Sequence, residues 1–426
     1  MFTYRPKDTY DPNWREFIGI QLVQLIEEFE ELIGEELVQE METALAIGAV
    51  GEMRRNGTYP PDDNLILAYS NPNYMRSLNI GWIGNRLQNS TFIDFANELG
   101  TQLLELFTAN GSNTLGEYQA PTYYGMDMFA LGSHVKYGPP NATMTKAAPY
   151  IISKVWEDVA DHYNGYLGNM AGPYDRAYTR DLTVHSAVIS YFWWGMFGRT
   201  NSPIPELGDA DLLYDVAQGA AISMVVANVR ENIPAETQNR LKAREFTGGN
   251  RFIQKNIRES LKTGYIRVAT SWLSKSLMIG GEIVDETVNR GGQFVPTIVH
   301  WASDPDHKPF PYIGFFSLYP SASTITAIAS ERSLTVSYPN TTQDGTSIFT
   351  FAISGMPPHW ILANNLVDGF RHLPCLNVTV NATGLQELPT TYGDMLEDHY
   401  FYNVTYVVPA NFEGVPSVSF EFEYTC

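Results

Sequence analysis

The spacing of apolar residues changes near residue 240, and this change most constrains the fold. Upstream, apolar residues recur at helical spacing, as in the segment 14–33. Downstream, period-two alternation and β-branched residues take over, as in 333–338 and 418–424. The sequence therefore predicts an α+β protein, with a helical domain over 1–240 and an antiparallel β-domain over 241–426.

The same patterns predict individual elements. Irregular loops join the helices in pairs, which indicates an α/α array, and the strands are expected to form a β-sandwich. The expected helices cover 14–33, 35–53, 74–87, 91–108, 123–135, 145–165, 182–198 and 209–232, and the expected strands cover 263–270, 294–301, 333–338, 347–353, 375–380 and 418–424.

Composition excludes two classes of partner. The formal net charge of -20 opposes binding to nucleic acid or to anionic lipid. No apolar run reaches the length of about 18 residues that a membrane helix needs, so we expect no membrane span. Aromatic residues make up 13% of the chain, a content typical of proteins that stack sugars on flat rings.

Sequons and cysteines favour an extracellular location. The start of the chain shows no secretion signal. The two cysteines, Cys375 and Cys426, can form a bridge worth about 4 kcal/mol, with two buried thiols as the alternative. We expect a secreted glycoprotein with Asn-x-Ser/Thr sequons at Asn56, Asn89, Asn110, Asn141, Asn340, Asn377, Asn381 and Asn403.

Three segments gather tyrosine, histidine, arginine and carboxylates. They run from 163 to 185, from 113 to 125 and from 300 to 312. The candidate catalytic residues are Tyr174, Tyr178, His185 and His300, and the candidate substrate-binding residues are Asn113, Glu117, Arg176, Trp194 and Trp301.

Some of these residues also have a structural interpretation. His185 can be a core histidine, and Tyr123 and Tyr124 are expected to pack as core aromatics. Trp193 and Trp194 are adjacent on one helix, so only one can face a sugar. No glycine-rich phosphate loop or Cys/His metal cluster occurs, so we expect no cofactor, although scattered carboxylates leave a structural Ca²⁺ open.

Helical pairs followed by a β-sandwich resemble the heparinase II/III and alginate lyase superfamily of polysaccharide lyases. The short motifs that carry the resemblance are a Pro-Thr-Tyr-Tyr segment at 121–124, a Gly-x-Tyr-x-x-x-Tyr loop at 172–178, and His300 with Trp301 in an early strand. The resemblance implies an α/α toroid and β-elimination at a uronic acid. In that family a polar group neutralises the C5 carboxylate of the uronic acid, a tyrosine or histidine removes the C5 proton, and a tyrosine protonates the leaving oxygen.

Carried over by position, the resemblance makes Tyr174 the acid/base and places Asn113 or Glu117 where the carboxylate-neutralising loop should be. It matches His300 to the histidine that reaches the site from the β-domain. Arg176 is expected to lower the pKa of Tyr174. The sequence departs from the family in two ways. Thr114 follows Asn113 where the family has an Asn-His pair. The helical half is also too short for a complete toroid, which suggests an incomplete ring of about four helix pairs.

Two other functions remain open. An inverting glycoside hydrolase on the same scaffold would use two carboxylates, such as Glu117 and Asp175. A non-catalytic glycan-binding protein would hold sugar without cleaving it. The sequence does not indicate the polysaccharide, its linkage or the oligomeric state.

Overall fold

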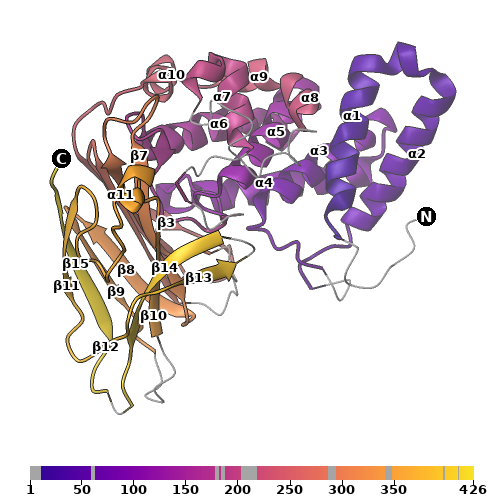
Figure 1. Cartoon of the computed structure of the whole chain (residues 1–426). Helices are drawn as coiled ribbons and strands as arrows, with labels where there is room; N and C mark the ends of the chain where they lie inside the picture. The colour runs from indigo at the N-terminus through magenta and orange to yellow at the C-terminus, as the bar shows by residue number, and fades with distance from the viewer. Residues whose placement is uncertain are drawn as a thin grey trace.

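The computed structural model describes residues 11–58, 63–177, 182–183, 188–202, 218–285, 294–340, 348–396, 399–410 and 412–426. Figure 1 shows a helical half and a curled sheet lying side by side, with the α1–α2 hairpin at the end farthest from the sheet. The predicted α+β class is confirmed.

The helical half is built from antiparallel hairpins. Gly34, at a positive φ, separates α1 from α2, and Asn89 caps α4 by accepting a hydrogen bond from the backbone of Phe92. The helices are α1 Trp14–Ile33, α2 Glu35–Glu52, α3 Ser70–Arg86, α4 Ser90–Thr108, α5 Pro121–Tyr137, α6 Thr143–His162, α7 Ile189–Phe197, α8 Gln218–Ser223, α9 Val226–Glu231 and α10 Ala235–Lys242.

These hairpins form two layers. Helices α1, α3 and α5 contact one another in a row, while α4 and α6 pair on the outer side. Nearly every residue of α3 and α5 is buried, whereas α4 alternates between buried and exposed positions. The described part of the helical half is therefore a layered α/α array. No helix in it combines the length and apolarity needed to cross a membrane.

The C-terminal half is one continuous antiparallel sheet, which corrects the expected two-sheet sandwich. Strand β5 pairs with β4 along one edge, and along its other edge it pairs first with β6 and then with β8. The sheet curls from this fork, and its inner face encloses a single apolar core. Its strands are β3 Arg251–Ile257, β4 Arg267–Leu273, β5 Leu277–Asp285, β6 Thr297–Asp304, β7 Tyr312–Pro320, β8 Thr324–Ser330, β9 Ser333–Ser337, β10 Ile348–Ser354, β11 Leu376–Asn381, β12 Gln386–Glu387, β13 Thr391–Leu396, β14 His399–Val407 and β15 Ser417–Tyr424.

Short elements complete the described chain. They are the two-residue strands β1 Tyr163–Asn164 and β2 Asn169–Met170, the 3₁₀ turns Ala109–Gly111 and Arg199–Asn201, and α11 Pro358–Leu362.

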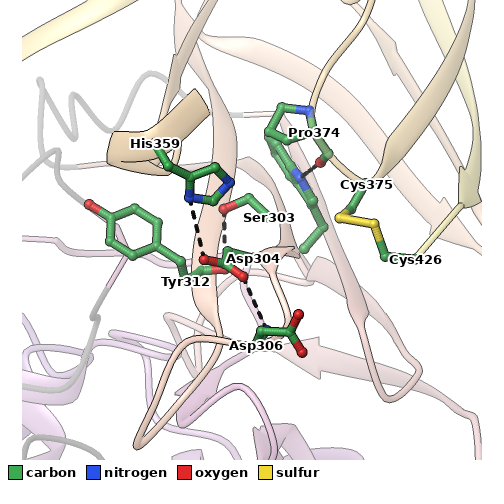
Figure 2. The surroundings of a disulfide bond; sticks show 9 residues. Ser303, Asp304, Asp306, Tyr312, His359, Pro374, Cys375 and Cys426 are labelled. Atoms are coloured by element: carbon green, nitrogen blue, oxygen red, sulfur yellow. Dashed lines mark hydrogen bonds and ion pairs between the residues drawn. A yellow bond between two sulfur atoms is a disulfide. The ribbon is translucent and has the colours of Figure 1, made fainter. Parts of the chain in front are cut away.

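A disulfide closes the C-terminal end of the sheet. Cys375 and Cys426 are bonded, as predicted, so the residue before β11 is joined to the last residue of the chain (Figure 2). Beside it, Asp304 faces His359 across 3.7 Å, at the end of the sheet that carries α11. The bridge thus ties β11 and β15 together at one end.

Candidate functional site

A buried arginine joins the two halves of the protein. Arg267, the first residue of β4, is fully buried and contacts both carboxylate oxygens of Asp175 at 2.6 and 2.7 Å. It also pairs with Glu282 and, at 3.1 Å, with Glu259. Burial acts to lower the pKa of the Arg267 guanidinium, but the surrounding carboxylates outweigh burial and hold it well above its usual value. Arg267 therefore stays charged.

The same arginine fixes the two loops that carry candidate site residues. Its Nη2 donates to the carbonyl of Gly116 at 2.6 Å. Asp175 accepts a 2.7 Å hydrogen bond from the backbone of Tyr118, and its own N–H donates to the carbonyl of Tyr118. Loop 113–120 and loop 172–177 are thus held together from the sheet side, with Glu117 and Arg176 next to the anchored residues.

Close backbone packing sets where Glu117 lies. A Cβ added at Gly116 would come within 2.6 Å of the carbonyl oxygen of Ala68, so only glycine allows this approach. Loop 113–120 consequently lies against the start of α3, where Asn71 donates to Glu117 at 3.3 Å. A side chain at position 116 would push Glu117 away from α3.

Six side chains meet here, and we call them the Glu117 cluster: Tyr69, Asn71, Glu117, Tyr123, Asp127 and Arg176. Arg176 Nη1 donates to the Tyr123 hydroxyl oxygen at 2.8 Å, and Arg176 Nε lies 3.9 Å from Glu117. Tyr69 packs edge-on against the Tyr123 ring, with centroids 6.0 Å apart. The Arg176 side chain is 37% exposed and that of Glu117 is 13% exposed, so the cluster reaches solvent.

The surroundings of the cluster shift the pKa values of two of its charged groups, Arg176 and Asp127. Partial burial acts to lower the pKa of Arg176, but Tyr123 and Glu117 outweigh it and raise that pKa. Asp127, one turn further along α5, is fully buried. Burial first, and then the charge of Glu117, raise the pKa of Asp127 well above its usual range, against the opposing effect of Ser70. Asp127 therefore favours its protonated form far more than an exposed aspartate does, close to the carboxylate of Glu117.

Tyr174 and His300 lie close together inside the interface between the two halves. Their ring centroids are 6.4 Å apart, and both side chains are fully buried. The Tyr174 hydroxyl donates to the carbonyl of Met170 at 2.5 Å, and burial raises its pKa well above the usual value. The expectation that Arg176 lowers this pKa is wrong, because Arg176 contacts Tyr123 instead. The catalytic roles of Tyr174 and His300 stay predictions.

The other candidates lie in different surroundings. Asn113 accepts a hydrogen bond from the Tyr150 hydroxyl at 3.0 Å. Trp301 is fully buried in the core of the sheet and donates to the carbonyl of Pro374. Trp194 is half-buried beneath Arg199, whereas Trp193 is buried. Tyr178 and His185 lie outside the described residues.

Sequence reasoning identified Glu117 and Arg176 but missed Tyr123, Asp127 and Arg267. Tyr123 is buried, as the sequence predicted for it, but from the first turn of α5 its hydroxyl also reaches Arg176 of the neighbouring loop. Arg267 is the one charged residue of the largely buried strand β4, and an arginine in that position is itself a signal of a paired carboxylate.

A metal centre has no support in the described part of the chain, because no group of three or more His, Cys, Asp or Glu side chains there could hold an ion.

The comparisons with known proteins assign the family. The model of a domain of unknown function (DUF8769) matches residues 1–228, more than half of the 426 residues. The chain belongs to the DUF8769 family. A second domain of unknown function (DUF8770) matches residues 249–423. No curated protein matches this DUF8769 protein. Among solved structures it is similar to a crystal structure of heparinase III, with 12% identity and a TM-score of 0.33, over 99% of this chain and 71% of that one.

The Arg267 contacts predict a large stability effect. Arg267→Met leaves Asp175 and Glu282 buried without their cation, which should lower the free energy of unfolding by about 3–5 kcal/mol. Arg332→Met, at an arginine whose side chain is 62% exposed in the turn between β8 and β9, serves as the control and should change the free energy of unfolding little. Urea unfolding measures both variants, and equal effects of the two substitutions would refute the role assigned to Arg267.

Buried His300 predicts an acid-sensitive fold. Burial lowers the pKa of His300 from 6.5 to about 4, although its ring nitrogen contacts the carbonyl of Leu182. Between these values the unfolded chain binds a proton that the folded chain does not, so stability falls as the pH falls. His300→Gln should reduce that slope by about 1.4 kcal/mol per pH unit. Unfolding midpoints across this range measure the slope, and an unchanged slope would contradict the prediction.

Proposed function

We propose that the protein is a secreted carbohydrate-active enzyme, a polysaccharide lyase that cleaves a uronic-acid-containing glycan by β-elimination. The observation that carries the proposal is the 2.8 Å hydrogen bond from Arg176 to the hydroxyl oxygen of Tyr123, next to Glu117. A cationic donor on a phenol oxygen favours the deprotonated form, which is the form that can remove a proton.

The cluster supplies the parts that β-elimination needs. Tyr123 removes the C5 proton of the uronate, the C4–C5 double bond forms, and the bond from C4 to the leaving oxygen breaks. Tyr123 then returns its proton to that oxygen. Arg176, with its exposed end, can pair with the uronate carboxylate and stabilise the charge that develops there. Glu117 orients Arg176, and Asn71 orients Glu117.

Two features of the architecture belong to the same proposal. The layered helical hairpins support an arc of an incomplete α/α toroid, with the Glu117 cluster at the N-terminal ends of α3 and α5 and on the loops beside them. We place the helical domain at 1–240 and the β-domain at 241–426. The last described helix before the sheet ends at Lys242, and β3 begins at Arg251.

A second candidate is a glycoside hydrolase that uses two carboxyl groups. One observation favours it: burial and the charge of Glu117 raise the pKa of Asp127 well above its usual range, as the acid of such a pair requires. The pair differs from the one expected from sequence, because Asp175 is bound at both oxygens by Arg267.

The reaction products distinguish these functions. A panel of uronate-containing polysaccharides, assayed for new reducing ends and for the ultraviolet absorbance of a conjugated double bond, should show both signals for a lyase. Reducing ends alone would establish a hydrolase and overturn the lyase proposal. Affinity for sugar with neither signal would establish a binding protein.

Matched tyrosine substitutions test which phenol acts. Tyr123→Phe removes one oxygen from the cluster and should lower kcat by a factor on the order of 10²–10⁴. Tyr174→Phe removes the same atom from a ring with no exposed surface, whose hydroxyl donates to the carbonyl of Met170 and does not contact Arg176, and should leave kcat close to the parent value. Removing the cation with Arg176→Met should lower the rate and move the optimum to higher pH. A large loss in Tyr174→Phe with none in Tyr123→Phe would return the acid/base role to Tyr174.

A further inference from the structure

One edge of the curled sheet is open. Strand β11 begins the strand order and pairs only with β15 among the described residues. The backbone groups along its other side have no strand partner in the part of the chain that the structure describes. An open edge is a template on which a second chain can add a strand, so soluble proteins normally protect it.

The usual protection is missing from β11. Its sequence, LNVTVN, contains neither a charged residue nor a proline. Val378 and Val380 face the apolar core, whereas Asn377, Thr379 and Asn381 are exposed. The disulfide at Cys375 holds the strand in place, so the edge stays presented.

Both exposed asparagines of β11 open a sequon. Asn377 is followed by Thr379 and Asn381 by Thr383, with no proline between. In the second sequon the Thr383 hydroxyl donates to the Asn381 side-chain oxygen at 2.6 Å, and the backbone N–H of Thr383 donates to the same oxygen at 3.2 Å. The two asparagines lie four residues apart on one face, about 13 Å along the strand.

Another sequon in the sheet lacks this geometry. Asn403 lies in β14, which pairs with β10 on one side and with β13 on the other. Its side chain is half-buried, and its oxygen is enclosed. A glycan on Asn403 would have to pass through the packed sheet, whereas the two asparagines of β11 are exposed to solvent.

We propose that Asn377 and Asn381 carry N-linked glycans that cover the open edge of β11 and prevent pairing between copies of the chain. The donor is a lipid-linked oligosaccharide pyrophosphate. A bond forms between the asparagine amide nitrogen and the anomeric carbon, the bond from that carbon to the pyrophosphate oxygen breaks, and the amide loses a proton as the lipid pyrophosphate leaves. The proposal needs secretory passage, which the disulfide supports, and it does not depend on lyase activity.

The first test maps the modification. Protein secreted from a eukaryotic host and analysed by peptide mass spectrometry should carry glycan at Asn377 and Asn381. Unmodified asparagine at both positions would overturn the proposal.

The second test measures association by sedimentation velocity over a range of concentrations. Asn377→Gln/Asn381→Gln should self-associate, and Thr379→Ala/Thr383→Ala should do the same, because it removes both sequons while keeping the asparagines. Asn141→Gln removes an exposed sequon from the helical half and should match the parent. If both double variants sediment like Asn141→Gln at every concentration, the glycans do not protect the edge and the proposal fails.

Discussion

The structure depends on one buried cation. Arg267 gathers Asp175, Glu282, Glu259 and the carbonyl of Gly116 around a guanidinium with no exposed surface. A charge in such a place is tolerated only with partners on all sides, so the partners must stay where they are. Because two of them belong to loops of the helical half, the sheet determines the position of those loops. Glu117 and Arg176 follow directly after the anchored residues, and the Glu117 cluster is assembled as a consequence.

Much of the secondary structure could be predicted, because the periodicity of a helix or of a half-exposed strand is present in its own short stretch of sequence. Amphipathic helices such as α4, and strands with one solvated face such as β9 and β15, carry their period in the sequence. Strands β5 and β7 were missed because they are buried on both faces and show no alternation. The single sheet was missed because β5 changes partner along its length, and pairing between distant strands leaves no pattern in the sequence.

The site was predictable only in part, for a related reason. Residue types gathered in loops pointed correctly to Glu117 and Arg176, which lie 3.9 Å apart. The sequence could not tell which way each tyrosine faces. Tyr174 turns into the interface and binds the carbonyl of Met170, whereas Tyr123 turns toward Arg176. That difference arises from the pairing of Asp175 with Arg267, two residues separated by 92 positions along the chain.

The most direct measurement is a crystal structure of the Tyr123→Phe variant with a uronate oligosaccharide bound. We expect the uronate carboxylate beside Arg176 and the C5 atom about 3–3.5 Å from the position of the missing tyrosine oxygen. The loops around Asp175 and Gly116 should remain as they are here. A sugar bound elsewhere on the protein, or one whose C5 atom faces Tyr174 and His300, would contradict the assignment of the Glu117 cluster as the active site.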